Sequence, residues 1–116
     1  MLVFKNTSIM VNINQPEMFS KKILKLLNDD ADQKKPWREL NEFVPEIMEL
    51  TNRHVFGGKM KNRVVEWKSF EGDDKTKAAI CQWDNGQFNE VTKIVLNTRV
   101  VTTKARLVEV LLHELQ

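Results

Sequence analysis

The chain begins with a β-prone apolar segment, after which the apolar residues recur with the spacing of a helix. Residues 2–13 are rich in Val, Ile and Phe, which favours one or two short strands or an extended arm. In residues 14–30, apolar side chains recur every three or four positions and Asn14 offers a cap, so the pattern predicts a helix. The polar residues 28–35 predict a linker. We interpret residues 1–35 as an N-terminal extension.

A second helical pattern covers residues 36–56. A single apolar stripe runs along it and begins with Trp37. Pro45 lies inside the pattern, so either the helix kinks there or two helices abut. Gly57 and Gly58 predict the end of the helix, because glycine readily adopts the backbone conformation that terminates helices.

Beyond these glycines the apolar period shortens to that of a strand. Residues 63–68, 78–83 and 91–96 are three strand candidates, separated by polar loops. Asn85 and Gly86 form a strong turn signal between the second and third candidates. These two strands are therefore predicted to pair as a hairpin.

The last residues return to helical spacing. Thr102 or Thr103 can cap this helix. Its apolar face consists of Leu107, Val108, Leu111, Leu112 and Leu115. The order of arm, helix, helix, three strands and helix predicts an α+β fold, with helices packed on a small three-stranded mixed or antiparallel sheet.

Composition narrows the class of protein without naming an activity. A chain of 116 residues is expected to form one domain at most. Its net charge of +2 argues against a nucleic-acid binder that depends on bulk charge. A local basic patch is compatible with this net charge. The single cysteine, Cys81, allows no disulfide within the chain and favours a reducing compartment. The sequence shows no signal peptide and no apolar run long enough to cross a bilayer, so we expect a nuclear or cytoplasmic protein that is not secreted and has no membrane contact.

The dipeptide His113-Glu114 in the last helix has two interpretations. By helical periodicity His113 lies opposite the leucine face, so it can be an ordinary solvent-facing residue of a surface helix. Alternatively, His113 to Gln116 are the first four letters of H-E-x-x-H, in which two histidines on one helix face share a zinc ion and the glutamate is the general base. Periodicity leaves both interpretations open.

Five pieces of sequence after Leu50 favour the second interpretation. They are "HVFGGKM" at 54–60, "VVEWK" at 64–68, "AAIC" at 78–81, "IVLN" at 94–97 and "LVEVLLHEL" at 107–115. In this order and spacing, over about two-thirds of the chain, they resemble the SprT-like zinc metalloprotease family, which includes Spartan and the germ cell nuclear acidic protein. Ala79 stands where that family has a glycine.

The resemblance implies a zincin-like fold in which the last helix carries the zinc site. It makes residues 36–116 the N-terminal portion of a SprT-like domain, with His113 as the first zinc ligand and Glu114 as the catalytic general base. The second and third ligand histidines would follow Gln116, so Zn²⁺ is expected in the complete domain and not as a tightly bound ion of this chain alone. The implied activity is cleavage of DNA-bound or DNA-crosslinked proteins in DNA repair. The alternative is a catalytically inactive fragment or isoform that binds DNA or protein.

Other residues have a structural and a functional interpretation. Arg53, Lys59, Lys61 and Arg63 form a basic cluster, which is either a solvated loop or a contact for DNA phosphates. Cys81 is interpreted as a small buried apolar residue and His54 as a cation or cap at the end of its helix.

Overall fold

A computed structural model describes residues 16–60, 63–83 and 91–115 of the chain. The expectations for residues 2–13, for the Asn14 cap and for the Asn85-Gly86 turn lie outside these ranges. The helices are α2 (Pro16–Leu27), α3 (Trp37–Asn41), α4 (Val44–His54) and α5 (Lys104–Glu114), with short 3₁₀ turns η2 (Asn28–Asp30) and η3 (Gly72–Asp74). The strands are β1 (Val64–Lys68), β2 (Ala79–Trp83) and β3 (Val91–Asn97). The predicted α+β class is confirmed.

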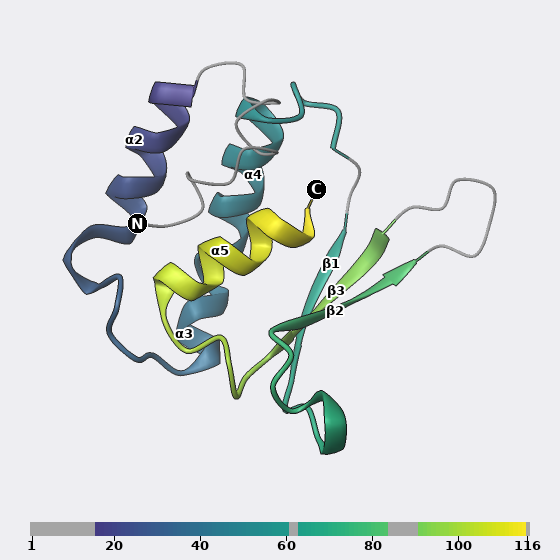
Figure 1. Ribbon diagram of the computed structural model, residues 1–116. Helices are drawn as coiled ribbons and strands as arrows, with labels where there is room; N and C mark the ends of the chain where they lie inside the picture. The colour runs from purple at the N-terminus through teal and green to yellow at the C-terminus, as the bar shows by residue number, and fades with distance from the viewer. Residues whose placement is uncertain (1–15, 61–62, 84–90, 116) are drawn as a thin grey trace.

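The three strands form a mixed sheet in the order β1-β3-β2. β3 is the central strand, parallel to β1 and antiparallel to β2, which confirms the predicted pairing of the second and third strands. Ile94 lies opposite both Val65 and Cys81, so these three side chains share one face of the sheet. Helix α5 contacts β2 and α4, and α4 contacts α2, so helices cover this face (Figure 1).

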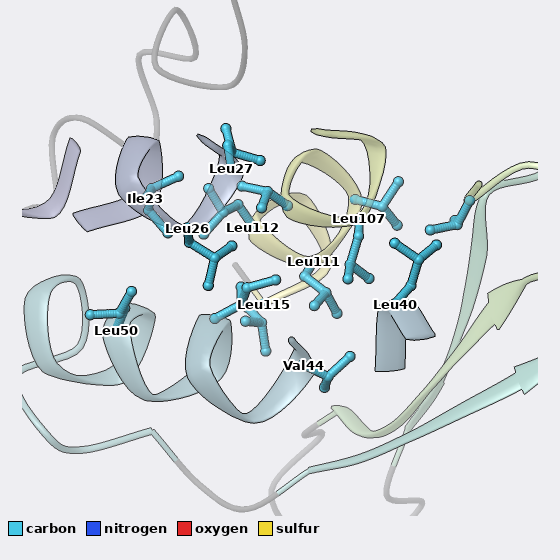
Figure 2. Close-up of a cluster of buried hydrophobic side chains, with 14 of the residues drawn as sticks. Ile23, Leu26, Leu27, Leu40, Val44, Leu50, Leu107, Leu111, Leu112 and Leu115 are labelled. Atoms are coloured by element: carbon cyan, nitrogen blue, oxygen red, sulfur yellow. The ribbon is translucent and has the colours of Figure 1, made fainter. Parts of the chain in front are cut away.

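The apolar core lies between α2, α4, α5 and the sheet (Figure 2). The leucine face of α5 is at its centre, because Leu107, Leu111, Leu112 and Leu115 are each at most 2 % exposed. Figure 2 shows Leu112 beside Leu26 and Leu27 of α2, and Leu115 above α4. Each buried leucine contributes about 1.5–3 kcal/mol relative to an exposed one, so this face holds α5 in place.

The stretch with Pro45 is two helices that abut, not one kinked helix. α3 ends at Asn41 and α4 begins at Val44, which places Pro45 in the first turn of α4, where its missing N–H costs nothing. Trp37 departs from the predicted apolar stripe because its side chain is 37 % exposed. It packs instead against Trp67 of β1, with ring centroids 5.9 Å apart.

Asn97, the last residue of β3, joins the two loops at one end of the sheet. Its Nδ2 donates to the backbone oxygens of Lys75 and Lys77, at 2.9 and 2.7 Å. Its Oδ1 accepts from the backbone N–H groups of Phe70 and Arg99, at 3.3 and 3.0 Å. The side chain is fully buried and every polar atom of its amide is paired, so it fixes the long connection between β1 and β2.

Thr103 is the cap of α5. Its hydroxyl accepts from the backbone N–H of Arg106 at 3.1 Å, which settles the choice between Thr102 and Thr103. The end of α5 lies against β2, where Glu114 bonds to Cys81, and His113 is exposed to solvent. Across residues 16–60, 63–83 and 91–115, no helix combines the length and apolar character that crossing a bilayer requires.

Candidate functional site

The last turn of α5 separates the two residues of the His-Glu pair. His113 is exposed to solvent, whereas Glu114 is half-buried and turned toward β2. Successive side chains on a helix differ by about 100° in direction, so burial of Leu112 and Leu115 leaves these two positions on different sides. The histidine is accessible to a ligand from solvent, and the carboxylate lies beside the edge strand.

A hydrogen bond joins Glu114 to the sheet. The Sγ of Cys81 donates to Oε2 of Glu114, with the two atoms 2.8 Å apart. Burial, and then the hydrogen bond and negative charge of Glu114, raise the pKa of the Cys81 thiol to about 12, against a smaller opposing effect of Arg63. The thiol therefore stays protonated at neutral pH and acts as a donor.

This pairing corrects the expectation for Cys81. The residue is half-buried, and its thiol has a polar partner, so it is not simply a small apolar residue of the core. The sequence contained part of the signal. Cys81 alternates with exposed Ile80 and Gln82, which assigns it to the inward face of its strand. Only the fold shows that Glu114 faces the same space.

Arg63 also reaches the end of α5. Its Nη1 donates to the backbone oxygen of Leu115 at 3.2 Å. A cation at this position complements the partial negative charge of a helix C-terminus. Residues from three separate parts of the sequence, Arg63, Cys81 and Glu114, thus gather where α5 ends beside the sheet.

The donor set for zinc is incomplete within the part of the chain that the structure describes. His113 offers an exposed imidazole, but these residues contain no group of three or more His, Cys, Asp or Glu side chains placed to hold a metal ion. The Cys81 thiol is bonded to Glu114 and belongs to no such group. His113 fits the role of one ligand, and a closed site needs further donors.

The four residues of the predicted basic cluster are in different surroundings. Arg53 pairs with Glu49 at 2.6 Å on the exposed face of α4, and Lys59 is exposed. Arg63 bonds to the end of α5, and Lys61 lies outside the described residues. A contact between this cluster and DNA stays a prediction.

His54 is not the helix-end cation that the sequence suggested. It is only 5 % exposed, packs against the ring of Phe19 at 5.8 Å, and its Nε2 has no hydrogen-bond partner. Burial, and then the charges of Lys22 and Arg53, lower its pKa below 6.5, so the neutral form prevails at neutral pH. The sequence did not predict this environment, because His54 is covered by α2, whose residues are distant from it in the sequence.

No protein-family model, curated protein or solved structure matches this chain.

Proposed function

We propose that this chain forms the front part of a SprT-like zinc metallopeptidase domain, in which His113 is a zinc ligand and Glu114 is the general base. The observation that supports the proposal most directly is the placement of this pair at the end of α5, beside β2. His113 is open to solvent, and the neighbouring carboxylate is held at the edge of the sheet. The remaining zinc ligands would be supplied by residues after Gln116.

The proposed role of Glu114 is proton transfer. Zinc, when bound in such a site, supplies a Lewis acid that activates water for attack on a peptide carbonyl. Glu114 would accept the proton from that water and later return it to the leaving amine, as a general acid and base does. Its carboxylate is half-buried, which limits its motion and favours a defined orientation.

The proposed position of the substrate follows from the sheet. β2 is an edge strand in the order β1-β3-β2 and lies against α5. An extended peptide can add to such an edge through backbone hydrogen bonds, which would align its scissile bond beside Glu114. By the family resemblance we propose that the substrates are DNA-bound or DNA-crosslinked proteins, cleaved in the nucleus or cytoplasm.

Two substitutions in the full-length protein test this function. His113→Ala should lose zinc and peptidase activity together, because it removes a ligand. Glu114→Gln should retain zinc and the fold but lose about 10²-fold or more in kcat, because an amide cannot accept the proton. Zinc content and cleavage of a DNA-bound protein are the measurements.

The control is Glu109→Gln, an exposed position one turn before the pair. This variant should behave like the wild type. If Glu114→Gln cleaves at the wild-type rate, or His113→Ala retains full zinc, the pair belongs to an ordinary helix. The inactive DNA- or protein-binding module is then the better description.

A further inference from the structure

The hydrogen bond between Cys81 and Glu114 joins strand β2 to helix α5. Strand pairing holds the first element in place, and burial of a leucine face holds the second. Cys81 lies in β2, in register with Ile94 of the central strand, and Ile94 is fully buried. Glu114 belongs to α5, whose leucine face is fixed in the core. The thiol is therefore a donor at a fixed place, at 2.8 Å from Oε2.

We infer that Cys81 is a positioning residue for Glu114, whose carboxylate it orients for proton transfer. This inference rests on the proposed function, because it assigns a role in the same site. A glutamate side chain has three rotatable bonds before its carboxylate, so ordering it costs about 1.5–2 kcal/mol of rotamer entropy. A donor fixed on the neighbouring strand offsets that cost and selects one rotamer before substrate arrives.

The direction of the bond suits this role. The thiol donates to Oε2 and leaves Oε1 to accept a proton from water. Because the pKa of the thiol is raised to about 12, the proton stays on sulfur throughout the pH range in which a peptidase works. The same protonation argues against Cys81 as a nucleophile, since the reactive form of cysteine is the thiolate.

The hydrogen bond itself can be observed without any catalysis. Cys81 is the only cysteine of these 116 residues, so this chain, expressed by itself, has a single S–H stretching band in the infrared spectrum. In Glu114→Ala this band should move to higher frequency, because the thiol loses its acceptor. The matched control is Glu109→Ala, on an exposed position of the same helix, which should leave the band in place. An identical band in wild type and Glu114→Ala overturns the inference.

The positioning role is tested by activity in the full-length protein. Cys81→Ala should lower kcat by about tenfold to a hundredfold, the usual cost of a misplaced catalytic group, while KM and zinc content change less than about twofold. Cys81→Ser should recover most of the activity, because serine keeps a donor at this position. Val95→Ala, on the opposite face of the central strand, controls for a general loss of sheet stability.

The outcomes separate this inference from the function on which it rests. If the wild type cleaves and Cys81→Ala cleaves equally well, the positioning role is wrong and the proposed function stands. If Cys81→Ser is as impaired as Cys81→Ala, side-chain volume matters instead of the donor, and the inference also fails. If the wild type neither binds zinc nor cleaves, the proposed function is wrong. The positioning role, which rests on that function, is then wrong too, whatever the S–H band shows.

Discussion

The Nζ of Lys104 lies 2.7 Å from Oδ1 of Asp30 and ties the start of α5 to the turn that follows α2. The same ammonium donates to the backbone oxygen of Leu26 at 3.1 Å and lies 4.4 Å from the ring centroid of Phe43. Lys104 is only 6 % exposed, so these partners replace the water that would otherwise stabilise its charge. Residues 28–35, expected to be a simple linker, therefore help to anchor α5.

Acid should weaken the fold through Asp30. Hydrogen bonds from Lys104 and then Lys35 lower the pKa of this carboxyl from 3.8 to about 2. Because the folded-state pKa is below the unfolded value, the stabilisation is complete above pH 3.8 and disappears as the pH falls toward 2. We expect Asp30→Asn to be less stable at neutral pH and to lose less stability over that acid range, as measured by urea unfolding. Parallel pH curves for the two proteins would contradict this role.

Removal of the Asn97 amide should be among the costliest single changes in the sheet. Asn97→Ala leaves four backbone groups without this partner, one in buried Phe70 and three in exposed residues, Lys75, Lys77 and Arg99. Each such group costs about 1–3 kcal/mol, and partial access of water reduces the sum, so we expect a loss of about 2–4 kcal/mol in the free energy of unfolding. Asn97→Asp keeps the acceptor but turns a carboxylate oxygen toward the carbonyls of Lys75 and Lys77, so it should not rescue stability. Chemical denaturation measures both variants.

The same chemical change at two leucines should separate core from surface. Leu111, on the inner face of α5, is fully buried, whereas Leu24 of α2 is 48 % exposed. Leu111→Ala should destabilise the protein by about 2–5 kcal/mol through lost burial and a cavity. Leu24→Ala should cost less than about 1 kcal/mol, because the side chain is already in contact with water. Equal losses in thermal unfolding would show that α5 does not pack as described.

Glu114 should control the reactivity of the Cys81 thiol. With a pKa of about 12, the thiol should react slowly with iodoacetamide at neutral pH. Glu114→Ala removes a hydrogen bond and a negative charge that both raise this pKa, so alkylation should accelerate, although burial still protects the thiol. Glu109→Ala should not change the rate. Equal rates in wild type and Glu114→Ala, followed by mass spectrometry against pH, would rule out the electrostatic link.

Local signals in the sequence were sufficient for most of the elements. The cap at Thr103, the helix break just before Pro45 and the apolar face of α5 each depend on residues a few positions apart, and all three are present. Strand periods also identified β1, β2 and β3 to within one residue. Such features depend on backbone chemistry and on which face of one helix or strand is buried. Both can be recognised in a short stretch of sequence.

Relationships between distant residues were beyond the sequence. A period of two does not show which strands are neighbours, so it does not predict the parallel pairing of β1 with β3. The partners of Cys81 and His54 belong to other elements, Glu114 of α5 and Phe19 of α2, and burial by those elements decides their ionisation. The zinc-site interpretation of His113 likewise depends on neighbours that periodicity cannot supply.

The central position of β3 has a consequence for the order in which the protein can fold during synthesis. Of the described strands, β3 leaves the ribosome last, yet β1 and β2 each pair only with it. Within the described sheet, neither strand therefore has its partner until β3, which ends at Asn97, has emerged. The leucine face of α5 follows within about twenty residues, so the sheet and its covering helix become available almost together. A nascent chain that stalls before β3 would expose two unpaired strands, the kind of surface that chaperones bind and that otherwise aggregates.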